Sequence, residues 1–586
     1  MNPTTKNARH IFLACVLATT TLLTQAQDAA KPAPLTVFIA KKIITMDPGW
    51  PEGTAVAVRD GKVLSVGTLE DLKPWLKSAP YSVDKTFANK ILLPGFIEPH
   101  GHPLNASATM TLRLLSAQPV PNPYGLPFAG IKTRAAALAL LKDYVAKAKS
   151  PDETIFTYGY DLIAFGGGHL DKTLLDTIST TQPIIVWDAS EHNAYLNSAA
   201  LAKYKMTRAD TATEGVIAGA DGEPNGQFIG ANGIRAIMPR AVAPLLQIDT
   251  AMKNIKWLMD LSRQNGITTT SDLVYGSIDL GLEAFIANKY FNAPGSPMRV
   301  VQIADSTKLM QVKGEQAVEF VQELMKRNND RIMLTGVKFF TDDAFLPLSG
   351  VMTNPGYTDG RKGIWLLPPD KLVEKFLPWW KAGLQFHVHA IADGNEAAIN
   401  ALAELQKLYP RFDHRYTIEH FGHSTTEQVR RLKALGGAVS ANPYFLYARS
   451  EYNAPYVGSD RAYTAVRLKT LVDAGVPTAL HTDSPVGPPK PLEEVWIAVN
   501  RFGLSGKVRG PAERVSVDQA LRMVTTDAAY VLGIDDKIGS IAVGKFADFV
   551  VLEQDPYVVP KEKIRDIKIW GTVSGGRVFP ASEIHE

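Results

Sequence analysis

The chain has 586 residues and a formal net charge of +3, with 45% hydrophobic and 21% charged residues. This length exceeds what one hydrophobic core usually holds, so it predicts two domains or one large barrel with additions. The small net charge and the lack of any run of Lys and Arg argue against a nucleic-acid partner.

The first 26 residues have the pattern of a secretory signal peptide, in which basic residues precede an apolar run beginning at Ile11. The run is too short for a permanent anchor, and the small residues Thr24 and Ala26 fit a cleavage site. We therefore expect a periplasmic or secreted protein with no stable membrane anchor after cleavage. Lipidation of Cys15 is the alternative, although only four apolar or small residues precede this cysteine.

Cys15 is the only cysteine, so the mature chain would contain no thiol and no disulfide. Stability after export must then come from burial of apolar residues, which a chain of this length can supply. Any bound metal would be held by histidine, carboxylate or a modified lysine.

Both ends of the chain contain short β-branched runs that are typical of strands. Residues 55–67 have a hairpin pattern, in which two such runs are joined through an Asp-Gly pair. Residues 548–552 near the other end have the same character, and a similar run follows them. These patterns predict one discontinuous β domain built from both termini.

The middle of the chain alternates strand and helix signals, which predicts an α/β fold of parallel strands with crossover helices. Apolar residues recur at helical spacing after the strand that ends at His389, namely Ala398, Leu402, Leu405 and Tyr409. Residues from about 103 to about 250 fit the alternation poorly and contain several Gly and Pro breaks. We interpret that span as an insertion over the site.

The most informative local pattern is His100-Gly101-His102, which directly follows the apolar strand pattern of residues 91–97. Side chains at positions i and i+2 of an extended segment point the same way, so both histidines can reach one ion. Neutral imidazole suits zinc, and zinc with few protein ligands keeps a position for water. Two ordinary surface histidines are the alternative, and the pair alone does not decide between them.

Other metal-competent residues follow further predicted strands: Lys338, His387 with His389, His420, and His481 with Asp483. A single histidine at a strand end is more often a hydrogen-bonded structural residue. Five strand ends that all finish in such residues are hard to explain by packing, because the carboxyl ends of barrel strands carry the chemistry. Together they predict a metal centre.

Asp483 and Lys338 each have a structural and a chemical interpretation. Asp483 would either cap the following helix or take a proton from a metal-bound water and pass it to a leaving amine. Lys338 lies among apolar residues of a predicted buried strand, where an unpaired ammonium is costly. It would either form a carbamate that bridges two ions or stay cationic and pair with Asp342 or Asp343.

These segments resemble the metal-dependent amidohydrolase superfamily, specifically its amidohydrolase 3 branch, which includes YtcJ-like proteins and N-substituted formamide deformylase. The resemblance runs nearly end to end after the signal peptide. It rests on Leu93-Pro94-Gly95-Phe96-Ile97 before His100-Gly101-His102, His192-Asn193-Ala194-Tyr195-Leu196-Asn197, Val337-Lys338 with Asp342, His389-Ala390-Ile391-Ala392-Asp393, Ile418-Glu419-His420, Thr482-Asp483-Ser484-Pro485, and Gly539-Ser540-Ile541 through Asp548.

The resemblance implies a distorted (β/α)8 TIM-like barrel, which we assign to residues 94–536, and a composite β-sandwich of residues 35–93 plus 537–586. It implies hydrolysis of an amide-type C–N bond by metal-activated hydroxide, with one or two divalent ions, of which zinc is expected. The expected partner is a small-molecule amide, such as an N-acyl or N-formyl amine, and homo-oligomer formation stays open. The alternatives are a deaminase or cyclic-amide hydrolase on the same site, and a non-catalytic solute-binding barrel.

Carried over by position, the resemblance implies a ligand set of His100, His102, Lys338, His389, His420 and Asp483. Lys338 would be the carbamylated bridge, and Asp483 would also be the catalytic proton shuttle. The substrate-binding residues would be His192 and Asp342, and the groups that support the ligands would be His387 and His481.

The chain departs from the branch near the expected pocket. Ala392 stands where the branch usually has Gly, and Gly394 where it usually has Arg. Asp343 stands where Gly commonly follows Asp342. These differences put the substrate in question more than the ligands.

Overall fold

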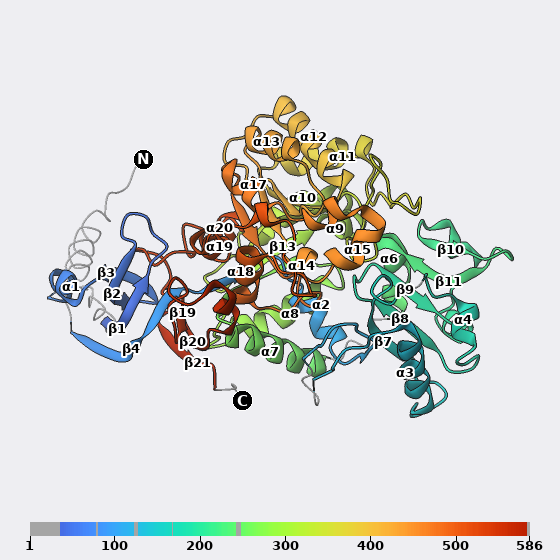
Figure 1. The fold of residues 1–586 in the computed structure, drawn as a ribbon, viewed down its shortest axis with the longest axis horizontal. Helices are drawn as coiled ribbons and strands as arrows, with labels where there is room; N and C mark the ends of the chain where they lie inside the picture. The colour runs from blue at the N-terminus through green and yellow to red at the C-terminus, as the bar shows by residue number, and fades with distance from the viewer. Residues whose placement is uncertain (1–34, 78–79, 122–126, 167, 242–247, 583–586) are drawn as a thin grey trace, which may run out of the picture.

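The structure is a computed structural model that describes residues 35–77, 80–121, 127–166, 168–241 and 248–582. The expected signal peptide, residues 1–26, lies outside the described residues and stays a prediction. Within the described part of the chain, no helix is both long enough and apolar enough to span a bilayer. Figure 1 shows a central barrel with a β domain on one side and an insertion on the other.

The centre of the molecule is a sheet of eight parallel strands in the order β18-β17-β16-β15-β14-β13-β12-β5. The strands are β5 (Phe96–Glu98), β12 (Ile267–Tyr275), β13 (Arg299–Asp305), β14 (Ile332–Phe340), β15 (Gln385–Ala390), β16 (Thr417–His420), β17 (Ala438–Ala441) and β18 (Thr478–Leu480). The first and last strands meet just beyond their ends, where Asp483 N donates to His100 O (3.0 Å) and His102 N to Ser484 O (2.8 Å). The predicted TIM-like barrel is confirmed.

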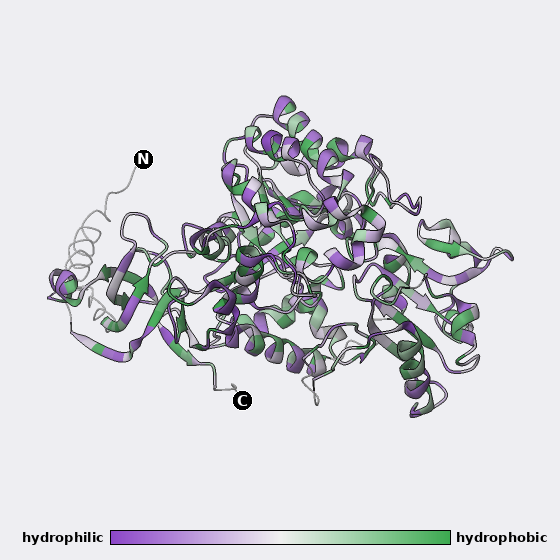
Figure 2. Cartoon of the chain, viewed as in Figure 1, coloured by the Kyte–Doolittle hydropathy of each residue, from purple (hydrophilic) through white to green (hydrophobic). Residues whose placement is uncertain are grey.

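Helices surround this barrel. They are α2 (Pro103–Thr109), α7 (Ile248–Gln264), α8 (Leu280–Phe291), α9 (Ser306–Lys313), α10 (Ala317–Met325), α11 (Pro369–Lys381), α12 (Asp393–Leu408), α13 (Thr426–Ala434), α14 (Tyr444–Tyr447), α15 (Ser450–Val457), α16 (Ser459–Tyr463), α17 (Leu468–Asp473), α18 (Pro491–Asn500), α19 (Val517–Met523) and α20 (Thr526–Val531). Figure 2 shows apolar and polar residues mixed along them, as expected for helices with one buried face.

Helix α12 shows how the sequence pattern places a helix on the barrel. Ala398, Leu402 and Leu405 are fully buried, as their spacing predicted, and each leucine contributes about 1.5–3 kcal/mol by burial. Tyr409 was predicted on the same face, but the helix ends at Leu408 and Tyr409 is 45% exposed. The helix therefore ends one residue before the fourth apolar position.

Strands from both termini form one seven-stranded sheet in the order β21-β20-β19-β4-β1-β2-β3. These strands are β1 (Leu35–Ile44), β2 (Glu52–Arg59), β3 (Lys62–Gly67), β4 (Tyr81–Pro94), β19 (Phe549–Leu552), β20 (Ile569–Ser574) and β21 (Arg577–Pro580), with α1 (Leu69–Leu76) beside them. The long strand β4 joins the halves, because it pairs with both β1 and β19. Phe38, Phe87 and Val573 lie in one shared core, so the composite β domain is confirmed.

A separate six-stranded sheet, in the order β10-β11-β9-β8-β7-β6, lies within the span predicted as an insertion. Its elements are β6 (Arg113–Leu114), α3 (Arg134–Ala146), β7 (Ile155–Tyr160), α4 (Lys172–Asp176), β8 (Ile184–Asp188), β9 (Asn193–Leu196), α5 (Ser198–Lys203), β10 (Val216–Ala218), β11 (Pro224–Ile229) and α6 (Gly230–Ala241). The turn between β8 and β9 brings residues 189–192 to the barrel. The exact domain bounds stay predictions.

Candidate metal centre and active site

Donor atoms from three strands of the barrel converge at its carboxyl-terminal end. His100, His102 and Asp483 form one group of metal-competent atoms, all within 4.8 Å of one another. Asp483 Oδ1 lies 3.0 Å from His102 Nε2 and 3.5 Å from His100 Nε2. A second group within the same distance joins His100 to His420 and His481. His100 belongs to both groups, so it lies at the centre of the cluster.

The carboxylate of Glu419 orients two of the histidines from behind. It is fully buried on β16, and its oxygens lie 2.6 Å from His100 Nδ1 and 2.6 Å from His387 Nδ1. Both nitrogens donate to the carboxylate, which leaves His100 Nε2 directed at Asp483. Metal-binding histidines are commonly held in this way. His387 therefore has the supporting position that was predicted for it, whereas Glu419 was missed although it precedes His420.

Glu98 ties together the two loops that carry ligand residues. Its carboxylate accepts hydrogen bonds from His100 N (3.3 Å), Thr482 N (3.1 Å) and Thr482 Oγ1 (2.5 Å). It is only 2% exposed. This role of Glu98 was not predicted from the sequence, because its partner Thr482 follows the last strand of the barrel.

His420 and Asp483 have backbone conformations that side-chain-bearing residues seldom adopt. Their φ angles are +72° and +59°. Such conformations cost about 1–3 kcal/mol and cluster at functional sites. The capping alternative for Asp483 is excluded, because the next helix, α18, begins at Pro491 and Lys490 is its N-cap residue.

Lys338 is buried at the base of the cluster, 1% exposed, with Nζ 3.4 Å from His100 Nε2. Burial lowers the pKa of Lys338 to about 8, although Glu419 and Asp483 oppose the shift. Among the described residues it forms no ion pair with an acidic side chain. The predicted alternative, pairing with Asp342 or Asp343, is not formed because those carboxylates have other partners.

His389, His420 and His481 pack close to His100, and burial favours the neutral form of all four imidazoles. The rings of His389 and His420 lie 4.6 Å apart, and His420 Nδ1 lies 3.1 Å from His481 Nε2. Burial lowers the pKa of His389 to about 3 and that of His481 to about 4. It also holds the pKa of His100 and of His420 well below the ordinary range. Neutral imidazole is the form that binds a metal ion.

The positions of His481 and His389 bear on their predicted roles, which stay predictions. His481 was predicted to support the ligands, yet its Nε2 lies within the second donor group, while its Nδ1 lies 2.7 Å from Ser440 Oγ. His389 was predicted as a ligand, and its Nε2 lies 3.2 Å from the carbonyl oxygen of Asp343, beside the donor groups but outside both.

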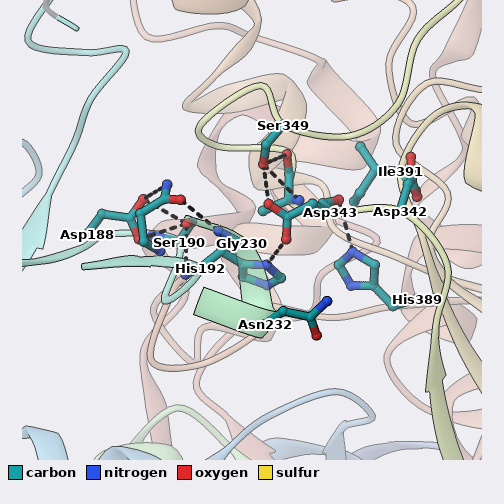
Figure 3. A network of polar contacts seen from close by, with 12 residues as sticks. Asp188, Ser190, His192, Gly230, Asn232, Asp342, Asp343, Ser349, His389 and Ile391 are labelled. Carbon is teal, nitrogen blue, oxygen red and sulfur yellow. Dashed lines mark hydrogen bonds and ion pairs between the residues drawn. The ribbon is translucent and has the colours of Figure 1, made fainter. Parts of the chain in front are cut away.

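His192 reaches the site from the insertion, and its substrate-binding role stays a prediction. Its Nδ1 is paired with Asp343 Oδ1, and Ser349 Oγ donates to Asp343 Oδ2 (2.6 Å). Its ring stacks on that of His389 with centroids 5.8 Å apart. Figure 3 shows Asp343 between the two histidines.

Asp342 was predicted to bind substrate, which stays a prediction, and the structure shows its carboxylate bound to backbone N–H groups. The carboxylate is 0% exposed and accepts from the backbone N–H groups of Val351 (3.1 Å), Ile391 (2.9 Å) and Ala392 (3.1 Å). It therefore fastens the loops at the ends of β14 and β15. Its neighbour Asp343 is instead paired with His192.

The same geometry explains one departure from the branch pattern. A Cβ atom at Gly394 would lie 2.0 Å from Asp342 Oδ1. An arginine at position 394 is therefore incompatible with the way Asp342 is held here.

The donor set fits a divalent metal ion. Neutral imidazoles and an ionised carboxylate are the ligands that zinc and similar ions prefer. The Asp483 carboxylate is ionised at neutral pH: burial would raise its pKa, but His102 outweighs this and the pKa is about 2. His102 Nδ1 is buried without a hydrogen-bond partner, as is Asp272 Oδ2. A buried site with this composition is best explained as a metal centre.

An eight-stranded barrel with imidazoles and a carboxylate at its carboxyl-terminal end defines the class of metal-dependent hydrolases. The sequence model of the amidohydrolase family matches residues 88–580, so the chain belongs to the amidohydrolase family. As predicted, it is a metal-dependent hydrolase acting on carbon–nitrogen bonds.

Relatives and solved structures agree with this assignment. The putative amidohydrolase YtcJ of Bacillus subtilis is 24% identical, over 89% of this chain and 95% of the relative. The N-substituted formamide deformylase of Arthrobacter pascens is 23% identical, over 92% and 97%. An uncharacterized metal-dependent hydrolase from Pyrococcus horikoshii has the same fold, with a TM-score of 0.65, 20% identity, and coverage of 90% of this chain and 99% of its own.

Proposed function

We propose that this amidohydrolase cleaves the amide bond of an N-acyl or N-formyl amine or a related small amide. The observation that carries the proposal is the convergence of His100, His102, His420 and Asp483 at the carboxyl-terminal end of the barrel, which His192 reaches from the insertion. A divalent ion held there, for which zinc is our proposal, would activate a water molecule and polarise the substrate carbonyl.

Asp483 is the proposed proton carrier. Its pKa of about 2 keeps it ionised, and Oδ1 faces both His100 and His102. An ionised carboxylate there can accept a proton from the attacking water and deliver it to the departing amine. The two transfers balance, because the amide nitrogen gains the proton that the water loses.

His192 is the proposed donor to the carbonyl oxygen. Burial opposes its charged form, but Asp343 outweighs burial and raises the pKa of His192 above its ordinary value. Because Nδ1 is bound to Asp343, Nε2 of the protonated ring can donate to the oxygen as negative charge develops on it.

Lys338 is the proposed site of a carbamate. Burial favours its neutral amine, which is the form that reacts with carbon dioxide, and the anion produced would remove the cost of a buried ammonium beside His100. The carbamate oxygens would then add anionic donors beside His100.

The deciding experiment uses the purified, metal-loaded protein with matched N-formyl, N-acyl and cyclic amides and an aminopyrimidine, while released amine or ammonia is measured. We expect the open-chain amides to be cleaved and Asp483→Asn to lower kcat about 10²- to 10⁴-fold. Cleavage of cyclic amides or deamination alone would replace the proposed substrate class. If the purified protein contains less than one equivalent of metal and gains no activity when metal is added, the proposal that it is a metal-dependent enzyme is refuted.

We also propose that the first 26 residues direct export to the periplasm or medium. The support is the basic start, the apolar run and the small residues before residue 27. Mass spectrometry of the exported protein would give a chain beginning near Gln27. An uncleaved cytoplasmic product would refute the export proposal.

A further inference from the structure

The turn between β8 and β9 carries a second ionisable side chain, Glu191, which the proposed reaction does not use. Its Oε1 atom is buried and has no hydrogen-bond partner. The charged groups that act on its carboxylate include His102, Asp483 and His192. Glu191 therefore faces the region above the donor groups, yet it belongs to neither candidate metal group among the described residues. A buried carboxylate oxygen without a partner is costly unless a group from outside the chain pairs with it.

The turn that presents Glu191 is tightly fastened. Asp188, at the end of β8, accepts hydrogen bonds from Ser190 Oγ (2.8 Å), Asn193 N (3.1 Å) and Asn193 Nδ2 (2.7 Å). His192 N donates to Ser190 Oγ (3.1 Å), and Gly230 N to Asn193 Oδ1 (3.2 Å). Figure 3 shows this network beside His192. The position of Glu191 is thus fixed by its neighbours rather than by a loose loop.

The backbone at Glu191 is in the left-handed region, with φ of +64°. Glycine adopts this conformation freely, whereas a residue with a Cβ atom is strained there. A glutamate at this position gives nothing to the turn that glycine would not give at lower cost. Strained residues of this kind cluster at functional sites, which points to the carboxylate itself.

The aromatic residue Tyr158 adjoins the carboxylate, and Trp187 packs against Tyr158. The Tyr158 hydroxyl of β7 lies against Glu191, and the rings of Tyr158 and Trp187 pack edge to face with centroids 6.0 Å apart. A carboxylate combined with aromatic surface is the chemistry that recognises an alkylammonium group.

We propose that Glu191 is a specificity residue that binds an alkylammonium group carried by the substrate near its scissile amide. The inference rests on the proposed amide hydrolysis and narrows its substrate class to cationic amides. Glu191 pairs with the ammonium through Oε1, while Tyr158 borders the aliphatic part of the substrate.

The test compares N-formyl-1,4-diaminobutane, which is cationic, with N-formylbutylamine, its neutral analogue of similar length. A hydrogen bond to a charged group predicts that the wild-type protein prefers the cationic compound by at least about tenfold in kcat/KM. Glu191→Gln should reduce that ratio to about one, mainly by raising KM for the cationic compound, with metal content retained. Asp152→Asn removes an exposed carboxylate from the same insertion and should leave the ratio as in the wild type.

The outcomes separate this inference from the proposed function. Cleavage of both compounds with no cation preference, or a ratio unchanged in Glu191→Gln, would overturn the role of Glu191 while amide hydrolysis stands. Loss of metal in Glu191→Gln would make Glu191 a ligand instead. If neither compound is cleaved, the hydrolysis proposal fails for this class. Equilibrium binding of both compounds to the metal-loaded protein then tests Glu191 directly, and equal affinities would overturn it.

Discussion

The barrel and the insertion meet at one site, but they build their parts of it in different ways. On the barrel side, Glu419 holds the buried His100 and His387 from behind, and burial keeps the pKa of His100 well below its ordinary range. On the insertion side, His192 is paired with a carboxylate that favours its charged form, and Glu191 leaves an oxygen without a partner. The barrel side thus carries the donor atoms that suit a metal ion, whereas the insertion side carries the residues that we propose meet the substrate. Variants on the two sides should therefore fail in different ways.

The largest effect is expected from Lys338→Ala. This change removes a proposed anionic ligand and opens a cavity beside His100, so both bound metal and activity should be lost. The metal-affinity loss should exceed the roughly 10- to 100-fold caused by losing an outer hydrogen-bond partner. Metal analysis and amide hydrolysis measure it, and a short carboxylic acid with bicarbonate should restore part of the activity. Full metal content in this variant would refute a bridging role for Lys338.

Glu419→Gln should give the next largest effect, because it weakens the barrel side without removing a ligand. Glutamine cannot accept from His100 and His387 through two anionic oxygens, so the ring orientation of both becomes less fixed. We expect metal affinity to fall about 10- to 100-fold, measured by competition with a chelator. Excess metal should recover most of the activity. Unchanged metal affinity would mean that the Glu419 carboxylate does not orient His100 and His387 for metal binding.

His192→Phe tests the insertion side by the same two measurements, bound metal and amide hydrolysis. Loss of one donor to a developing oxyanion costs about 10²- to 10³-fold in kcat, and metal content should stay that of the wild type. His169→Phe is the matched control, because His169 is an exposed histidine of the same insertion. Metal loss in His192→Phe would show that the two sides are not separable.

More of the site residues on the barrel side than on the insertion side could be predicted from the sequence, for a physical reason. Ligand residues follow apolar strands, and the carboxyl ends of parallel strands converge, so His100, His420 and Asp483 could be predicted to lie together. The supporting roles of Glu98 and Glu419 could not be predicted, because their partners lie on strands that are distant in sequence. Which of Asp342 and Asp343 pairs with His192 depends on the backbone conformation after β14, which the sequence does not reveal.

The insertion side depends on backbone conformation, which a sequence pattern does not reveal. The span of about 103–250 gave a poor barrel signal because it contains its own mixed sheet. The positive φ of Glu191 has no signature in a single sequence, since glutamate is not a residue that predicts a left-handed turn. The sequence did identify the neighbouring His192 as a candidate substrate-binding residue, because its segment resembles the family motif.

The smallest expected effect is on stability, and it tests whether the insertion side is strained. Glu191→Gly should be more stable than Glu191→Ala by about 1 kcal/mol, because only glycine relieves the left-handed conformation. Both variants lack the carboxylate, so their difference isolates the backbone and not the charge. Denaturant unfolding of the two proteins, each loaded with metal, measures it. Equal stability would mean that the turn carries no strain at Glu191. Backbone strain would then no longer support a functional role for the Glu191 carboxylate.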